Sequence, residues 1–389
     1  MRKLTRLALG ALAAGALAAP ALAEDGVTAT EIVIGNHTAL SGPVSAWGIG
    51  STEGIRMRFD EANDKGGIHG RKIKFIVEDH QYQVPRAVQA ANKLINNDKV
   101  FAMVGALGTP MNNAVLGEQL QKGVPNLFPF TAARSMAEPF HKLKFAAFST
   151  YYDQVRAVVK HFVEKEGKKK VCSMYQDTDF GHEIRDGVRD QVKALKIEVA
   201  AEAAYGPMDT EFVAPITKLK SADCDVVVMG SIIKDSIVSV GTAKKLGWSG
   251  VVFVGQAASY DPIVAAAPGG VMEGFYSATG LPFAYPDTAP EPIKAWAAKY
   301  KERTKQDPNT AAQYGYVIGD IVVKALEGAG KDLTRAKLVS ALEAIKDYRP
   351  MFPGAAVNFG PDRRQGSTAS FLAKVEGGRW KVVGENLIY

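Results

Sequence analysis

The sequence predicts an α/β protein made of two doubly wound lobes, each built on a parallel sheet. Apolar, strand-like runs alternate with helical segments through most of the chain, and the alternation pauses after residue 128 and begins again at residue 169. The length of 389 residues also exceeds what one hydrophobic core normally organises. We therefore expect two lobes of similar construction.

The first series supplies four strands and three helices. Ile55, Phe59 and Ala62 share one face of the first predicted helix, and the third strand is almost entirely apolar, as expected for a strand covered on both faces. The predicted strands are 31–35, 73–78, 100–105 and 124–128, and the predicted helices are 52–63, 85–96 and 111–121.

The second series repeats this pattern and ends in a tail. We expect strands at 169–176, 197–200, 225–230 and 251–254, with helices at 184–195 and 212–220. Residues 274–290 are rich in Pro, Gly and aromatic residues, which predicts a crossover loop. Helices follow at 291–304, 311–328 and 334–345, and the tail predicts short antiparallel strands at 355–359, 371–374 and 380–383.

The first 23 residues predict a secretory signal peptide. Three basic residues, an apolar stretch over 7–19 and the small-x-small motif Ala21-Leu22-Ala23 follow one another in the expected order. The alternative is an uncleaved membrane anchor. Removing these basic residues brings the 47 Lys and Arg close to the 41 Asp and Glu, so the charge gives no reason to expect a nucleic-acid partner. We expect a periplasmic protein.

Motifs for catalysis, cofactors or metals are incomplete. The glycines at 48–54 do not form a dinucleotide fingerprint, so a dehydrogenase is disfavoured, and Ser231–Lys234 matches S-x-x-K without its partner motifs. Asp177 and Asp179 are not followed by further ligands at calcium-loop spacing. We expect a binding protein, not an enzyme, with no cofactor and no metal.

The two cysteines, Cys172 and Cys224, each stand at the beginning of a strand-like run. In an oxidising compartment they can pair if their strands are neighbours. Two buried free thiols are the alternative, and the sequence leaves both open.

The strongest local motif follows the third predicted strand. Gly108, Thr109 and Pro110 open a helix, with Thr109 suited to the N-cap and Pro110 to the first helical position. A helix N-terminus at the carboxyl end of a parallel strand can bind a small anion. Phe130–Ala132 repeats this arrangement after the next strand. The pattern predicts a carboxylate site.

These motifs stand within a larger resemblance. Ser41-Gly42-Pro43, Trp47-Gly48, Asn63 to Gly70, Gly123-Val124-Pro125 and Asp177 to Gly181 occur in the order typical of one family. The chain resembles, from about residue 32 to its end, the type I periplasmic solute-binding proteins of branched-chain amino-acid (Leu/Ile/Val) ABC transporters.

The resemblance implies two lobes joined by three crossovers, which close on a ligand. Lobe 1 would comprise 24–148 plus 278–352, and lobe 2 would comprise 149–277 plus 353–389. It also implies membrane permease subunits as partners, and we expect a monomer. The residues at the family's pocket positions are Trp47, Gly108, Thr109, Phe130, Thr131, Ala132, Tyr151, Tyr152, Phe180, Ile232, Gln256 and Ala257.

The chain departs from the amino-acid binders of that family at one telling place. Where those proteins hold the ligand ammonium with an acidic residue, this chain has Gln256 and Ala257, although Asp261 lies close by. Burying an ammonium without a counter-charge costs several kcal/mol. We therefore expect a hydrophobic or aromatic carboxylate as ligand, with branched-chain or related amino acids as the alternative. A ligand-sensing receptor on the same fold is the alternative of another class.

Overall fold

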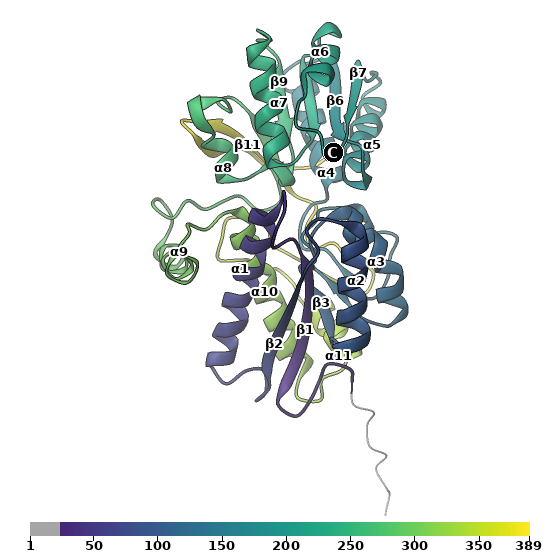
Figure 1. The fold of residues 1–389 in the computed structure, drawn as a ribbon, viewed down its shortest axis with the longest axis vertical. Coiled ribbons are helices and arrows are strands. Elements are labelled where there is room, and N and C mark those ends of the chain that lie inside the picture. The colour runs from purple at the N-terminus through teal and green to yellow at the C-terminus, as the bar shows by residue number, and fades with distance from the viewer. Residues whose placement is uncertain (1–23) are drawn as a thin grey trace, which may run out of the picture.

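The computed structural model describes residues 24–389, so the predicted signal peptide lies outside the described residues. Two sheets, each with helices packed on its faces, lie one above the other in Figure 1. The predicted fold class of two α/β lobes is confirmed. No helix within residues 24–389 is both long and apolar enough to cross a membrane.

The first sheet is fully parallel and has the order β2-β1-β3-β4-β5. Its four predicted strands are present, and the fifth pairs through only two residues, too few to give a recognisable apolar run. The strands are β1 (Glu31–Thr38), β2 (Lys72–Asp79), β3 (Ala102–Val104), β4 (Asn126–Leu127) and β5 (Lys144–Phe145).

The helices of this lobe pack around two apolar clusters, a larger one that includes Ile34, Phe128 and Ile318 and a smaller one that includes Ala91, Met103 and Val115. They are α1 (Ser45–Asp64), α2 (Val84–Asn92), α3 (Thr109–Gln121), α9 (Glu291–Thr304), α10 (Thr310–Ala329) and α11 (Arg335–Glu343).

Helix α1 begins seven residues before the predicted position because its early glycines serve packing. A Cβ atom on Gly48 would lie 2.0 Å from the Ala39 carbonyl oxygen, and one on Gly54 would lie 2.2 Å from that of Ala312 in α10. Only glycine permits these close approaches. Because glycine has a low helix propensity, the sequence pattern did not indicate the first turns of this helix.

The second sheet has seven strands in the order β12-β11-β10-β9-β8-β6-β7. The strands β6 to β10 pair in parallel, whereas β11 and β12 are antiparallel additions at one edge. The strands are β6 (Val171–Gln176), β7 (Ala201–Tyr205), β8 (Val226–Gly230), β9 (Val252–Gly255), β10 (Tyr276–Thr279), β11 (Ser370–Glu376) and β12 (Arg379–Leu387). Its helices are α4 (Tyr151–Glu164), α5 (Asp179–Ala194), α6 (Val213–Ser221), α7 (Ile233–Lys245) and the short α8 (Pro262–Ala265).

Three sequence predictions are wrong in detail. The strand expected at 197–200 lies at 201–205. Ile197 and Val199 instead pack against the apolar cluster to which α5 contributes. The strand expected at 355–359 forms only one isolated bridge, between Tyr348 and Val357. The loop expected at 274–290 contains β10.

Two predicted crossover points also shift. The break expected at 277/278 falls inside β10, and Leu281 already packs in the core of the first lobe. The break expected at 352/353 comes too early, since Val357 and Phe359 belong to that same core and β11 begins at Ser370.

The structure joins Cys172 and Cys224 by a disulfide bond. Cys172 lies in β6 and Cys224 precedes β8, and these two strands are direct neighbours in the sheet. The bond therefore ties two central strands of the second lobe.

We predict that replacing both cysteines by serine lowers the free energy of unfolding by about 2–4 kcal/mol, because the bond closes a long loop in the unfolded chain. The loop spans a sequence separation of 52 residues. Urea denaturation followed by circular dichroism measures the change. An unchanged midpoint, with the bond verified intact in the wild type by mass spectrometry, would contradict the prediction.

Candidate functional site

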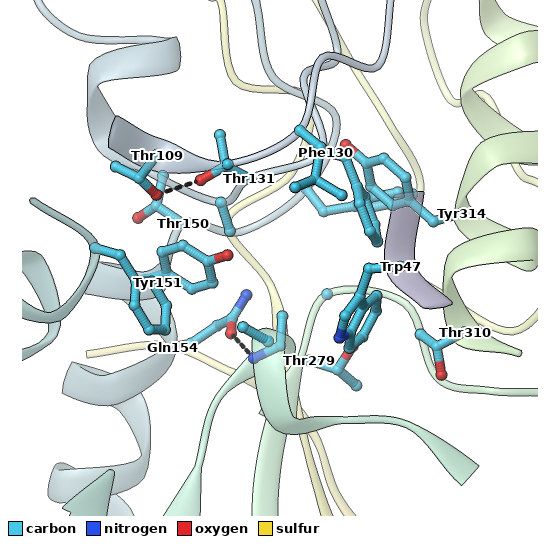
Figure 2. Close-up of a pocket in the computed structure, with 18 of the residues that line it drawn as sticks. Trp47, Thr109, Phe130, Thr131, Thr150, Tyr151, Gln154, Thr279, Thr310 and Tyr314 are labelled. Atoms are coloured by element: carbon cyan, nitrogen blue, oxygen red, sulfur yellow. Dashed lines mark hydrogen bonds between the residues drawn. The ribbon is translucent and has the colours of Figure 1, made fainter. Parts of the chain in front are cut away.

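One cavity, partly open to solvent, lies between the two lobes. Its walls come from the ends of α1, α3, α4, α5 and α10 and from the connections between the lobes. Figure 2 shows Thr109, Thr131, Thr150 and Tyr151 on one side of it and the rings of Trp47, Phe130 and Tyr314 on the other, where Thr310 also lies. Ten predicted residues line this cavity: Trp47, Gly108, Thr109, Phe130, Thr131, Ala132, Tyr151, Phe180, Ile232 and Ala257.

The other two predicted residues lie outside the cavity lining. The Tyr152 hydroxyl donates to Asp190 at 2.6 Å, and its ring lies 3.7 Å from the Arg134 guanidinium carbon. Tyr151 occupies the cavity instead, because neighbouring residues in the first turn of α4 point in different directions. The Gln256 amide is buried and donates to the main chain at Ser231, so it serves the second lobe's own structure.

The hydroxyl side is organised by a side-chain hydrogen bond between the Thr109 and Thr131 hydroxyls, 2.7 Å apart and buried. The predicted N-cap role of Thr109 is wrong. Gly108 caps α3 with a φ of 96°, a conformation that favours glycine, and Thr109 begins the helix. The Thr109 hydroxyl is thus available to the cavity and not to its own helix.

Main-chain N–H groups add to this side of the cavity. Within residues 24–389, those of Thr131 and Ala132 donate to no main-chain or side-chain acceptor, and Thr109 lies in the first helical turn, where N–H groups lack intrahelical partners. The N-terminus of α3 also carries a partial positive charge. This arrangement of donors can hold a small anion.

The Tyr151 hydroxyl lies on the same side of the cavity as the Thr109 and Thr131 hydroxyls. Burial raises the pKa of Tyr151 to about 12, although the main chain of Ala132 and the Thr131 hydroxyl act in the opposite direction. Tyr151 therefore remains a neutral hydroxyl at physiological pH and can donate to an anion.

A chain of aromatic contacts forms the opposite wall. Ring centroids lie 5.3 Å apart for Trp47 and Phe130, 4.9 Å for Phe130 and Tyr314, and 5.9 Å for Phe148 and Tyr314. The Tyr314 hydroxyl donates to the Pro129 carbonyl at 3.1 Å, so this hydroxyl is already paired within the protein. Ile232 and Ile233 of the second lobe pack with Trp47 in one apolar cluster.

Sequence reasoning missed several lining residues, among them Tyr82, Gln154, Thr279 and Tyr314. Tyr314 stands in the second turn of a correctly predicted helix, and an aromatic residue near a helix end could have indicated it. Gln154 had no such signal, because its role depends on a contact over 103 residues: its amide oxygen accepts from the Ala257 N–H at 2.9 Å (Figure 2).

Two buried histidines support the site from behind. His80 Nε2 lies 3.2 Å from the Leu107 carbonyl oxygen, and His80 Nδ1 accepts from the Tyr82 N–H at 3.0 Å. Burial lowers the pKa of His80 to about 4 and that of the adjacent His37 to about 3. His80 is therefore neutral and ties together two segments that line the cavity.

Among the lining residues, all within the described part of the chain, there is no Asp, Glu, Lys, Arg or His. Asp261, the carboxylate nearest to Ala257 in sequence, accepts instead from the N–H groups of Ile263 at 3.0 Å and Thr310 at 3.3 Å. No cluster of three or more His, Cys, Asp or Glu suited to a metal ion occurs between residues 24 and 389.

Residues 31–379 match the model of the periplasmic binding protein family. The chain belongs to this family. A Leu/Ile/Val-binding protein homolog of Brucella abortus is 24% identical over 330 residues, which cover 82% of each chain. The predicted resemblance is confirmed, and the chain is an extracytoplasmic solute-binding protein.

Two solved structures of the same architecture extend the comparison. A fatty acid ABC transporter substrate-binding protein from Thermomonospora curvata has a TM-score of 0.83 and 25% identity over 94% of each chain. A solute-binding protein from R. palustris, solved in complex with benzoate, has a TM-score of 0.79 and 19% identity over 92% of this chain and 97% of that one. The chain shares its fold with both.

We predict a pH-dependent effect of replacing Asp261 by Asn. Burial raises the pKa of Asp261 to about 6, so its charged form is disfavoured in the folded state. Its contribution to stability is therefore full below the ordinary carboxyl pKa near 4 and is lost as the pH rises to about 6. Asn keeps an acceptor without the charge. The variant should gain up to about 3 kcal/mol relative to the wild type between pH 4 and pH 8.

Thermal unfolding of both proteins across this pH range measures the difference. Asp287→Asn is the control, because Asp287 is exposed and its pKa is lowered by Arg379. A wild-type minus variant difference that stays constant with pH would contradict the assignment.

Proposed function

We propose that this protein captures a small hydrophobic or aromatic carboxylate in the periplasm and delivers it to the permease subunits of an ABC importer. The predicted signal peptide supports the location, and family membership supports the transporter partners. The observation that carries the ligand class is the polarity of the cavity, which has neutral donors on one side, aromatic rings on the other and no charged side chain.

The donor side suits a carboxylate. Hydrogen bonds from neutral donors to an ionised group are stronger than those between neutral groups, and closing the cleft would remove competing water. The Tyr151 hydroxyl, the one hydroxyl hydrogen that the Thr109–Thr131 pair leaves over and the free N–H groups of Thr131 and Ala132 supply donors without a buried counter-ion. The carboxylate would therefore be held by dipoles alone.

The aromatic side suits an apolar body and disfavours an ammonium. An amino acid would bring its ammonium into the cavity with no carboxylate to pair it, since Ala257 and Ala258 stand on the second-lobe side. Leaving a charge buried and unpaired costs several kcal/mol. Ring faces of Trp47, Phe130 and Tyr314 offer favourable stacking to an aromatic ligand.

The relatives include binders of both ligand classes. The benzoate and fatty-acid proteins support the acid, whereas the Leu/Ile/Val-binding homologs favour branched-chain amino acids as the second candidate. The missing counter-ion supports the acid as the first candidate.

We predict that benzoate- or cinnamate-type acids raise the melting temperature of the mature protein, whereas leucine, isoleucine and valine do not. A ligand that binds only the native state stabilises it in proportion to its concentration over Kd. Differential scanning fluorimetry with each compound at millimolar concentration makes the comparison. Stabilisation by the branched-chain amino acids alone would reverse the ligand assignment.

We also predict that Ala257→Glu weakens the binding of an aromatic acid by more than tenfold. The new carboxylate would face the cavity and repel the ligand's negative charge, which a low-dielectric site screens poorly. Ala257→Gln provides the matched control, because it adds nearly the same volume without charge. Isothermal titration calorimetry on both variants separates the two effects, and equal losses would refute the electrostatic explanation.

A further inference from the structure

A second contact region flanks the cavity where α5 of the second lobe meets the first lobe. Asn113 in α3 donates to the Asp179 carboxylate in α5 at 2.9 Å, and Ser135 donates to the Asn113 side-chain oxygen at 2.7 Å. Both contacts are exposed. We call these contacts, together with Arg134 and Glu183, the α5 seam.

Glu183 is the buried member of the α5 seam. Its carboxylate accepts from the Arg134 main-chain N–H at 2.8 Å and lies 3.8 Å from Arg134 Nε, with about a tenth of its side chain exposed. Arg134 follows directly on the loop of residues 130–133, which supplies the Thr131 and Ala132 donors to the cavity. Glu183 of the second lobe therefore binds the main chain at the end of residues 130–133, the loop of the first lobe that we call the anion-binding loop.

The same loop is held at two further points. The Ala132 carbonyl oxygen accepts from the Tyr151 N–H at 2.7 Å, and the Thr131 hydroxyl bonds to Thr109. Tyr151 begins α4, directly after the crossover expected at 148/149, whereas Glu183 comes from a separate helix, α5. The Glu183 contact therefore joins the loop to a part of the second lobe that does not adjoin this crossover, so it depends on the approach of the two lobes across the cleft.

We propose that Glu183 is a positioning residue that fixes the anion-binding loop from the opposite lobe, so that the anion site is complete only when the cleft closes. In an open cleft, water hydrates both Glu183 and the Arg134 N–H. On closing, the loop gains its third anchor and the ligand's carboxylate is enclosed. This inference rests on the proposed function, because it explains how the proposed carboxylate site depends on closure of the cleft.

The contact acts through its acceptor more than through its charge. Burial raises the pKa of Glu183 to about 7, although the Arg134 main chain and guanidinium and the Tyr152 main chain lower it and Asp153 adds to the rise. Both the ionised and the protonated carboxyl keep an oxygen that accepts from the Arg134 N–H. A glutamine in this position keeps the acceptor as well.

Three variants test the inference, with benzoate as the probe and calorimetry as the readout. Glu183→Ala leaves the Arg134 N–H without a partner in the closed state and should weaken binding about ten- to a hundredfold. Glu183→Gln should stay within about threefold of the wild type. Asp179→Ala, which removes an exposed acceptor of the same seam, should also change affinity little.

Melting temperatures distinguish positioning from a general structural role. Without benzoate, all three variants should melt close to the wild type, because the contact forms only on closure, and only Glu183→Ala should lose the rise that benzoate produces. Equal affinity of Glu183→Ala and wild type, an equal loss in Asp179→Ala, or an equally lowered melting temperature without ligand would overturn the inference. A wild type that binds no organic acid would overturn the proposed function and this inference together.

Discussion

The architecture of the site depends on one hydrogen bond between two loops, the 2.7 Å contact between the Thr109 and Thr131 hydroxyls. Each threonine follows a neighbouring parallel strand, β3 or β4, so the sheet register places the two loops side by side. The bond uses the hydroxyls on each other and leaves the main-chain donors beside them free. Backbone dipoles at the edge of the sheet can then bind an anion without any cationic side chain.

Several other contacts of the first lobe hold the loops around Thr109 and Thr131 and the opposite wall of the cavity in position. Gly108 adopts a φ of 96°, which turns Thr109 toward the cavity, and a Cβ atom there would lie 3.0 Å from both Tyr82 and Met111. His80 links Leu107 to Tyr82 from behind. The close glycine contacts between α1 and α10 hold Trp47 and Tyr314 on the opposite wall. Rigid walls lower the entropy lost when a ligand is ordered.

The sequence allowed the fold class and most of the site to be predicted, because both depend on local patterns. Strand runs such as 100–105 are apolar by themselves, and Gly108-Thr109-Pro110 marks a helix start without knowledge of any partner. Several of the failures involve partners far along the chain. Gln154 acts through Ala257, Val357 packs into a core made of earlier residues, and Tyr152 turns toward Asp190 and away from the cavity.

The same distinction applies to the two lobes as a pair. Each sheet could be assigned from its own segment, whereas the choice between Tyr151 and Tyr152 required the direction of α4 relative to α3. The absence of a counter-ion could be suspected from Gln256-Ala257, but Asp261 remained close enough in sequence to supply one. Its position as the cap of α8, turned toward Thr310, removes it from the cavity.

A crystal structure of the mature protein with bound benzoate tests the central claim most directly. The account predicts that the carboxylate oxygens lie within hydrogen-bonding distance of the N–H groups of Thr131 or Ala132 and of the Thr109 or Tyr151 hydroxyl, with the ring against Trp47 and Phe130. A carboxylate held by an Arg or Lys side chain, or one turned toward Ala257 at the other lobe, would contradict it.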